Sequence, residues 1–266
     1  MALFGRFLLL CLLFSSVVQA RSFDGITEAI ESSVMGMTVS GRVDSIWVSE
    51  GTFVRKGDII LNLNKENEEI QVGVTRLILE SKADLNAART KMEIYQKDYL
   101  ATKKLFETST SVSEEQVWEK ELAYKSAVSE YEKLQMAEEK EELEYQMALV
   151  QLEEKILRAP FDGVIVRIGK NKSESVEALE PFVEIADVRV CRMISYVLAP
   201  NAASLKKGQT VQLQLDGAKK KRYKKGKIEF ISPVVDKSSM LRTVKVIFDN
   251  KDQKIEPGVT GKILLK

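Results

Sequence analysis

The chain has 266 residues, of which 44% are hydrophobic and 30% are charged, a length that suits one large domain or two to three small ones. It contains no histidine, so the usual general base and the commonest metal ligand are both missing, and we expect no enzymatic activity, no cofactor and no metal site. The 40 lysines and arginines balance 39 aspartates and glutamates, which excludes net charge as a guide to the partners of this protein.

The first 20 residues have the layout of a secretory signal peptide. Arg6 precedes an apolar run that begins at Phe7, and the small-residue site that ends at Ala20 predicts cleavage after this residue. The run is shorter than the ~20 residues that cross a bilayer as a helix, although an uncleaved anchor is the competing interpretation. Cleavage leaves Cys191 as the only cysteine, so we expect no internal disulfide and a small buried hydrophobe at this position.

Two short β motifs, far apart in the sequence, each hold too little strand to bury a core alone. The first covers 41–63 and is punctuated by glycines at turn positions, among them Gly51 and Gly57. The second covers 157–166. We therefore predict one split domain that brings the end of the first motif beside the start of the second. The segment between them must leave this domain and return to it.

From 65 to 106 the sequence has one glycine, Gly73, and no proline, and its apolar residues repeat at spacings of three and four. This heptad seam predicts one long helix that packs against another helix. The seam consists of Val74, Ile78, Leu85, Ala88, Met92, Tyr95, Tyr99 and Phe106, with Ser81 and Thr102 completing it.

A second helix is predicted to begin at a capping box of Ser113 and Gln116, in which each side chain bonds a backbone N–H of the other residue, and to end near Lys155. Its inward residues are expected to be Val117, Tyr124, Val128, Tyr131, Leu143, Met147 and Val150. Because the two arms are nearly equal and reflect about Thr110, we predict an antiparallel coiled-coil hairpin. Its seam turns polar at 138–142.

After residue 188 the sequence changes to many short strand patterns with turn signals between them. Strands are expected at 190–198, 211–215, 227–231, 243–248 and 262–265, with a short helical piece at 200–205. This spacing predicts a small antiparallel barrel.

Together these residues resemble the periplasmic adaptor subunits of tripartite efflux pumps, also called membrane fusion proteins, of the resistance-nodulation-division (RND) type. The resemblance rests on the two β motifs, the helical insert and three barrel segments, 205–209, 236–243 and 255–259. It implies a mixed α and β, multidomain fold with a split lipoyl-like barrel-sandwich domain, a long antiparallel coiled-coil hairpin and a small antiparallel β-barrel.

The resemblance also implies domain bounds. These are 1–20 for the signal peptide, 21–34 for an N-terminal segment that joins the β-barrel, 35–64 and 157–187 for the two halves of the lipoyl-like domain, 65–156 for the α-helical hairpin, and 188–266 for the β-barrel. Because the sequence stops directly after the barrel, we expect the family's membrane-proximal domain to be missing.

The function that the resemblance implies is that of a non-enzymatic adaptor in the periplasm. Such a protein links an inner-membrane efflux transporter to an outer-membrane channel, assembles as a homo-oligomeric ring and supports export of small molecules. An adaptor of an ATP-driven exporter would have the same three domains and stays an alternative. A free periplasmic binding or regulatory module is a second alternative. The secretory signal argues against a nucleic-acid partner.

Two sets of residues are candidates for partner binding. At the expected hairpin tip the resemblance implies docking roles for Leu105 and Ser113, with Ser111 between the helices, while Ala101 stands where the family has an arginine. The second set is a basic run, either a solvated loop of the barrel or a contact for an acidic transporter surface or anionic lipid headgroups. It comprises Lys219, Lys220, Lys221, Arg222, Lys224, Lys225 and Lys227.

Overall fold

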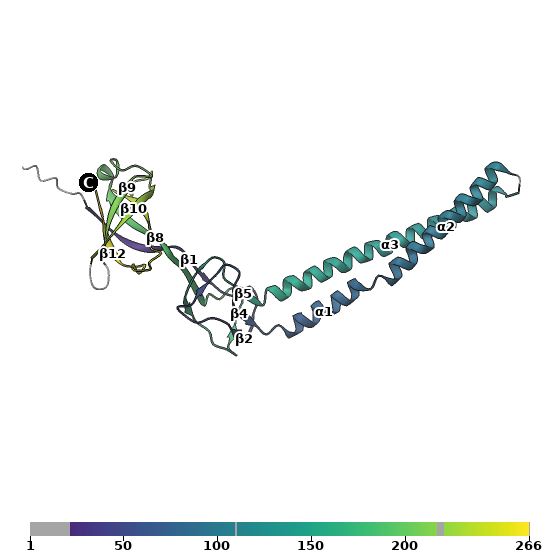
Figure 1. Ribbon diagram of the computed structural model, residues 1–266, viewed down its shortest axis with the longest axis horizontal. Coiled ribbons are helices and arrows are strands. Elements are labelled where there is room, and N and C mark those ends of the chain that lie inside the picture. Colours follow the sequence, from purple (N-terminus) through teal and green to yellow (C-terminus); the bar gives the residue numbers. More distant parts are fainter. Residues whose placement is uncertain (1–21, 110, 217–220, 266) are drawn as a thin grey trace, which may run out of the picture. The chain divides into compact units, whose positions relative to one another are not determined.

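The structure is a computed structural model that describes residues 22–109, 111–216 and 221–265 (Figure 1). The expected signal peptide, 1–20, lies outside these residues. The chain forms two compact units, one made by the described parts of Met1–Ser33 and Ala186–Lys266 and the other by Val34–Ile185. The expected fold class of mixed α and β, with sheet domains, a long helical hairpin and a β-barrel, is confirmed. The finer domain bounds stay predictions.

The first unit is a closed barrel of six strands. Around the barrel the strand order is β1-β12-β9-β10-β11-β8, and β8 pairs with β1 again to close it. The strands are β1 (Ser22–Met35), β8 (Val183–Leu198), β9 (Thr210–Asp216), β10 (Lys221–Ile231), β11 (Leu241–Asp249) and β12 (Thr260–Leu264), and the short helix α4 (Ala199–Ala202) follows β8. The ladders β1–β12, β12–β9, β9–β10, β10–β11 and β11–β8 are all antiparallel, as expected for a small barrel.

Alternate side chains along the strands form the barrel core. Leu213 and Leu215 of β9 and Val244 and Val246 of β11 are fully buried, whereas the residues between them are less buried, as the period of two in a strand requires. Thr27, Ser195 and Asn250 are the buried polar residues of the described barrel, and Asn250 follows directly after β11. Its Nδ2 donates to the carbonyl oxygens of Val188 and Ile255, and its Oδ1 accepts from the Ile255 N–H.

The second unit contains the split domain, and here the two β motifs do meet. Its strands are β2 (Gly41–Ile46), β3 (Phe53–Val54), β4 (Ile59–Leu63), β5 (Ile156–Arg158), β6 (Gly163–Ile168) and β7 (Ser175–Val176). One sheet has the order β5-β4-β2-β7, and β3 pairs with β6. In the register, Ile59 lies opposite Arg158 and Leu61 opposite Leu157. The expected pairing across the long insert is therefore confirmed.

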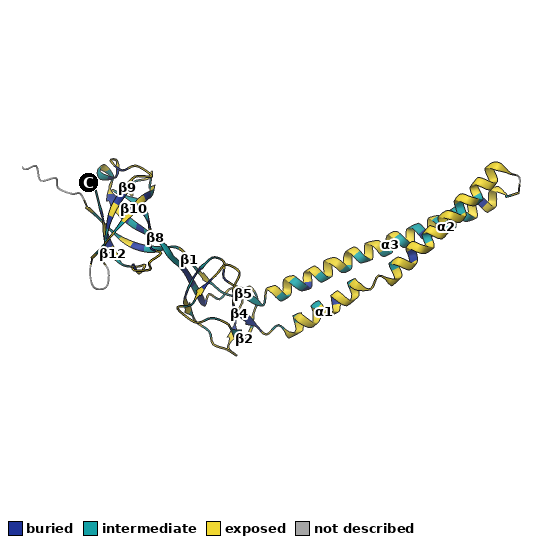
Figure 2. Cartoon of the chain, in the orientation of Figure 1, coloured by how far each residue is buried: buried dark blue, intermediate teal, exposed yellow. Residues whose placement is uncertain are grey.

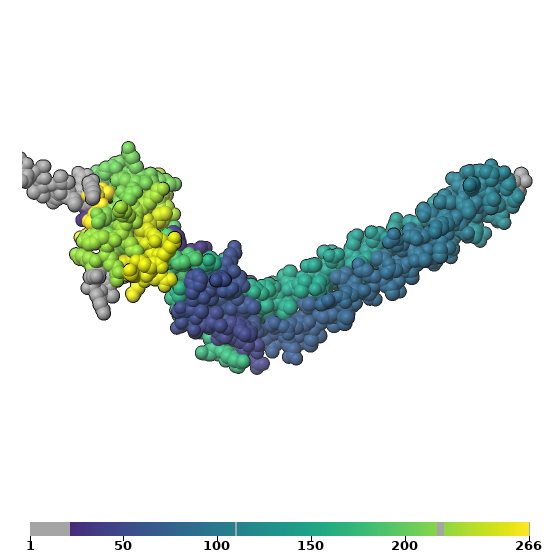
Figure 3. Space-filling model, in the orientation of Figure 1, coloured from purple at the N-terminus to yellow at the C-terminus, as the bar shows by residue number. Residues whose placement is uncertain are grey.

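The core of the split domain draws on both motifs. Ile60 and Leu63 from the first motif and Ile165 and Ile185 from the second half are fully buried in one cluster. The space-filling view shows residues of the two halves, coloured dark blue and green, within one body (Figure 3). Neither half buries these side chains without the other, so the insert is anchored at both ends by one shared core.

The insert is a helical hairpin in which α1 (Glu66–Glu80) and α2 (Ala83–Thr108) run antiparallel to α3 (Glu114–Glu153) (Figure 1). The capping box at the start of α3 is confirmed, since the Ser113 Oγ accepts from the Gln116 N–H and the Gln116 Oε1 accepts from the Ser113 N–H. At 1.5 Å per residue the 40 residues of α3 extend roughly 60 Å. Burial is confined to the inner side of the helices (Figure 2).

The first arm is not one continuous helix, which corrects the sequence-based expectation. It breaks at Ser81 and Lys82, between α1 and α2. The α2 residues of the expected seam from Leu85 to Thr102 do face α3, but Val74 and Ile78 are 46% and 45% exposed. The side chains of α1 that lie against α3 are Val72, Thr75 and Leu79 instead.

A one-residue change of phase explains the break. In a heptad seam spacings of three and four alternate, so a seam at Thr75 and Leu79 would continue at residues 82 and 86. The seam of α2 begins at Leu85 and Ala88, one residue too early. Because a continuous helix could not present both sets to α3, the chain leaves helical geometry between them. Lys82, at the break, forms a 2.5 Å ion pair with Glu138 of α3.

The second arm, α3, also differs from expectation over its last 16 or so residues, from about Glu138 to Glu153, which we call its lower half. Leu143, Met147 and Val150 were expected to face inward but are 69%, 61% and 59% exposed. Tyr145, Ala148 and Leu152 lie against the first arm in their place. The seam of α3 keeps its phase through the polar stretch at Glu138 and Glu141, whereas the sequence interpretation restarted the seam at the next apolar residue.

Candidate partner-binding surfaces

The hairpin tip is built from two helix ends that satisfy their own backbone groups. At the end of α2 the Ser109 N–H and Oγ both bond the Leu105 carbonyl oxygen, and the Thr108 Oγ1 donates to the Lys104 carbonyl oxygen. The Ser111 N–H donates to the Ser109 Oγ. The hydrogen-bonding groups of these polar residues are therefore used within the tip itself. Contacts with a partner would be made by the other side chains at the tip.

The three residues expected at the tip have different surroundings. Leu105 is 53% exposed, and Ser111 and Ser113 are both exposed. The Ser113 hydroxyl already accepts a hydrogen bond as the helix cap, so Leu105 and Ser111 are the two that a partner would meet without displacing an internal contact. Phe106, expected in the seam, is 43% exposed instead.

Two apolar residues near the tip were missed in the sequence. Trp118 and Leu122 on the first turns of α3 are 63% and 68% exposed. Their spacing of four places them on one side of the helix, outside the seam formed by Val117 and Tyr124. A large aromatic residue and a leucine paired outside the seam were the signal in the sequence. Together with Leu105 and Phe106 they place four exposed apolar side chains among the polar and charged residues of the outer end of the hairpin.

Below the tip the two arms are tied together by polar and aromatic contacts. Tyr99 and Tyr124 stack with ring centroids 6.1 Å apart, and the Lys103 Nζ lies 6.0 Å from the Tyr99 ring centroid. Lys120 bonds Asp98 at 2.9 Å, and this hydrogen bond raises the pKa of the Lys120 ammonium. Lys103 therefore contacts the Tyr99 ring. It lies two residues after Ala101, the exposed position where the resemblance implies an arginine.

The described part of the basic run, from Lys221 to Lys227, is a strand and not a loop, which corrects one of the two interpretations for these residues. Lys221, Arg222, Lys224, Lys225 and Lys227 lie on β10, whose ladder with β9 runs from Lys221 opposite Asp216 to Lys227 opposite Thr210. Strand β10 begins at Lys221 and not near residue 227. Lys219 and Lys220 lie outside the described residues. We call the five described residues the basic strand.

The basic strand has two faces with different chemistry. Arg222 and Lys224 share the inward side with Gly226 and Ile228, and Lys224 bonds Asp252 at 2.8 Å, which lowers the pKa of that carboxyl group. Lys221, Lys225 and Lys227 alternate outward and are exposed, and among the described residues no ion pair engages them. Tyr223, also outward, is 57% exposed. The outward face therefore combines three available ammonium groups with one aromatic ring.

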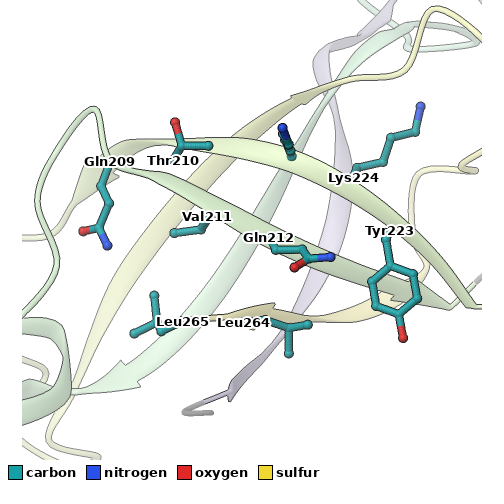
Figure 4. Close-up of a pocket in the computed structure, with 9 residues that line it drawn as sticks. Gln209, Thr210, Val211, Gln212, Tyr223, Lys224, Leu264 and Leu265 are labelled. Carbon is teal, nitrogen blue, oxygen red and sulfur yellow. The ribbon is translucent and has the colours of Figure 1, made fainter. Parts of the chain in front are cut away.

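A hollow of about 530 Å³ adjoins this outward face (Figure 4). The register places Lys225 opposite Gln212, and Gln212 opposite Leu264, so one row of side chains crosses three strands. Tyr223 lies at the rim of the hollow and Gln212 within it. The mixture of amide, phenol, ammonium and leucine suits a protein or lipid surface better than a small charged ligand, because the hollow is shallow and its polar groups do not converge.

The part of the chain that the structure describes holds neither a metal-ligand cluster nor an exposed thiol. In 22–109, 111–216 and 221–265 no group of three or more acidic, cysteine or histidine side chains is arranged to hold a metal ion. Cys191 is fully buried, and this burial raises the pKa of its thiol to about 11. No helix in the same part of the chain is long and apolar enough to cross a membrane.

Comparison with known proteins gives one family match and a set of similar folds. Residues 196–266 match the family model of the CusB-like β-barrel domain. The structure is similar to MacA from Actinobacillus actinomycetemcomitans (TM-score 0.76, 20% identity, 93% of this chain and 78% of that chain covered). No curated protein matches the sequence.

Two further solved structures have the same fold. One is the membrane fusion protein Spr0693 from Streptococcus pneumoniae R6, with a TM-score of 0.55 and 15% identity over 92% of this chain and 99% of that chain. The other is a putative efflux transporter from Bacteroides eggerthii, with a TM-score of 0.55 and 20% identity over 92% of this chain and 68% of that chain. The resemblance to membrane fusion proteins is therefore confirmed in the fold and in the barrel domain.

Proposed function

We propose that a protein with this fold acts as a periplasmic adaptor of an efflux pump and makes or breaks no covalent bond. The observation that carries the proposal is a hairpin of roughly 60 Å anchored by both ends in one split domain, in a chain that also has a CusB-like β-barrel domain. A long two-helix rod with a capped tip that exposes apolar side chains is suited to reach and bind another helical protein.

In this proposal each surface has its own partner. The basic strand contacts an acidic surface of an inner-membrane transporter of the RND type, since Lys221, Lys225 and Lys227 present exposed positive charge on a regular strand face and form no ion pair with any residue that the structure describes. The hairpin tip, with Leu105 and Ser111, docks onto an outer-membrane channel. Several copies form a ring, which completes a conduit for small molecules.

An ATP-driven exporter in place of the RND transporter is the nearest alternative, because the same domains serve both. The identity of the protein that contacts the basic strand decides between them. The free binding module is less favoured, since the hollows on the barrel are shallow and open and a module of that kind has no use for a long hairpin.

Photo-crosslinking in whole cells tests the proposal. A photoreactive residue is placed at Ser111 or at Lys221, and the captured proteins are identified by mass spectrometry. Ser111 is expected to capture an outer-membrane channel and Lys221 an inner-membrane transporter. Glu130, exposed halfway along α3, is the control and is expected to capture neither. Capture of no membrane protein from either position, together with ligand-dependent stabilisation of the purified chain, would support the free module instead.

Two substitutions separate the cap role of Ser113 from a docking role. Ser113→Ala removes the cap and is expected to destabilise the hairpin by about 1 kcal/mol, whereas Ser113→Asp keeps a good cap and removes the hydroxyl. If Ser113 serves only as a cap, Ser113→Asp retains full export activity in cells. Loss of export in Ser113→Asp with unchanged thermal unfolding would assign the hydroxyl to the contact with the channel.

A further inference from the structure

A second hollow on the barrel, of about 620 Å³, crosses four neighbouring strands. These strands are β8, β1, β12 and β9, and the hollow lies on their outward side, where Ile26 and Tyr196 are exposed. Since adjacent strands are about 4.8 Å apart, the hollow extends roughly 14 Å across them. Its size is within the range of sites that bind small organic molecules.

The floor of the hollow is backbone. Gly25 of β1 and Gly261 of β12 lie opposite each other in the ladder, and both line the hollow. A Cβ at Gly25 would lie 2.4 Å from the Ile194 carbonyl oxygen, and a Cβ at Gly261 would lie 2.7 Å from the Gln214 carbonyl oxygen. Only glycine fits at such short distances, so the neighbouring strands approach closely at this point of the barrel wall.

One end of the hollow is apolar. Ile26 of β1 and Tyr196 of β8 are 58% and 64% exposed, and Ile194 of β8 lines the same end. The Ser195 hydroxyl donates to the Asp24 carbonyl oxygen at 2.6 Å, which holds this part of β8 against β1. An aromatic ring and two isoleucines therefore form one apolar surface that is open to solvent.

The other end of the hollow has a carboxylate without an ion pair in the described chain. Asp216 of β9 is exposed and accepts a neutral hydrogen bond from the Thr260 hydroxyl at 2.8 Å. Lys221 lies opposite Asp216 in the ladder but forms no ion pair with it. Lys245 of β11 lies over the Phe230 ring, with its Nζ 6.0 Å from the ring centroid, and does not line the hollow.

The two remaining carboxylates of the lining have cations beside them. Asp24 pairs with Lys262 at 3.3 Å, and Glu28 shares Arg192 with Glu229, at 3.4 Å and 2.8 Å. The first pair is exposed and such pairs contribute little. Of the described residues that line the hollow, three carry a carboxylate and none carries an ammonium or guanidinium group. The lining therefore favours a cation over an anion.

We propose that this hollow binds an amphipathic organic cation, with the apolar body of the ligand against Tyr196 and Ile26 and its positive charge toward Asp216. The ring face and the carboxylate both attract positive charge, and the isoleucine side chain covers apolar surface of the ligand. Because the hollow is open, binding is expected to be weak and rapidly reversible. In the proposed function the ligand is a molecule in transit. This role rests on that function, whereas binding itself does not.

Isothermal titration calorimetry with the purified chain tests the site. The probe is tetraphenylphosphonium, and the matched control is tetraphenylborate, an anion of the same shape and apolar surface. Tetraphenylphosphonium is expected to bind saturably and roughly tenfold more tightly than tetraphenylborate, since the described lining has carboxylates and no cation. Added salt is expected to weaken the binding of tetraphenylphosphonium.

Two variants locate the binding, and two matched variants are the controls. Asp216→Asn keeps the hydrogen bond from Thr260 and removes the charge, so it should weaken binding roughly tenfold. Tyr196→Leu should weaken binding severalfold. The controls are Asp249→Asn, at an exposed carboxylate outside the lining, and Tyr223→Leu, at a ring that is 57% exposed on β10. Both should bind as the natural chain does, and all four variants should keep its thermal unfolding.

Three results would overturn the inference. They are equal affinity for the two probes, unchanged affinity in both Asp216→Asn and Tyr196→Leu, and absence of saturable binding up to roughly 1 mM probe. Because neither a transporter nor a channel is present in this experiment, such a failure leaves the cellular capture by Ser111 and Lys221 untouched.

Discussion

The side-chain amide of Asn250, directly after β11, bonds both β8 and the loop before β12. Its Nδ2 donates to the carbonyl oxygen of Val188 in β8 and to that of Ile255 in the loop before β12, and its Oδ1 accepts from the Ile255 N–H. Asn250→Ala is expected to lower the free energy of unfolding by about 2–3 kcal/mol, because several buried backbone groups lose their partner. Urea unfolding measures the loss, and Asn67→Ala, at an exposed position, is the control with little expected change.

Asp236 makes the stability of the barrel depend on pH, and this contribution can be measured separately from those of other carboxyl groups. Hydrogen bonds from the Ser238 hydroxyl and from Ser239 lower the pKa of this carboxyl group to about 2 in the folded protein, from an ordinary value of 3.8. Because the pKa of Asp236 is lower in the folded protein than in the unfolded chain, its ionised carboxylate stabilises the fold at every pH above about 4. This stabilisation is lost as the pH falls from about 4 to about 2.

Asp236→Asn should therefore destabilise the barrel more at pH 6 than at pH 2. The measurement is the difference in urea midpoint between the natural chain and Asp236→Asn at both pH values, so that the titration of other carboxyl groups cancels. A difference that does not change with pH would show that the folded pKa of Asp236 is not depressed.

At the scale of the elements, the break between α1 and α2 makes a prediction about chain length. One alanine inserted between Ser81 and Lys82 restores the alternation of three and four across the break. It is expected to join the two helices, to raise the helical circular dichroism signal and to protect the amides at 79–84 from hydrogen exchange.

An insertion elsewhere in the arm provides the matched control. One alanine between Lys97 and Asp98 moves the α2 seam out of phase with Tyr124 and its neighbours, so the melting temperature of the hairpin should fall. If both insertions destabilise the hairpin equally, the break has another cause than the change of phase.

The elements that the sequence predicted correctly are those in which one local signal decides the structure. The capping box at Ser113 and the seam from Leu85 to Thr102 have unambiguous spacing, and the pairing of Ile59 with Arg158 follows from two half-domains that need each other. The inward side of α1 and of the lower half of α3 was wrong, because apolar residues lie on both sides of these helices. The sequence pattern alone does not say which side the partner arm covers.

The binding surfaces were predictable only in part for the same reason. Composition identified the basic run, but only the ladder with β9 separates the outward Lys221, Lys225 and Lys227 from the inward Arg222 and Lys224. Trp118 and Leu122 were passed over because the sequence interpretation assigned α3 residues to the seam alone, and exposure becomes visible only when the packing of both arms is known.

For the whole molecule, charge removal tests the proposed contact between the outward lysines and a transporter. Lys221→Gln, Lys225→Gln and Lys227→Gln combined are expected to reduce crosslinking to the inner-membrane partner severalfold, because each removes a long-range attraction. The fold should persist, since all three side chains are exposed. Export activity measures the consequence in cells. The control is Lys91→Gln, Lys97→Gln and Lys125→Gln on the hairpin, which changes the net charge equally and should leave the transporter contact intact.

The pairing of β1 with β12 has a consequence for how the protein comes into being. Phe23 lies opposite Ile263 in this ladder, so the earliest described strand cannot pair with the last one until everything between them has been synthesised. Until then the hydrogen-bonding groups along that edge of β1 are open to other chains. Barrel closure is therefore expected to be a late and slow event, because it joins the most distant parts of the described sequence.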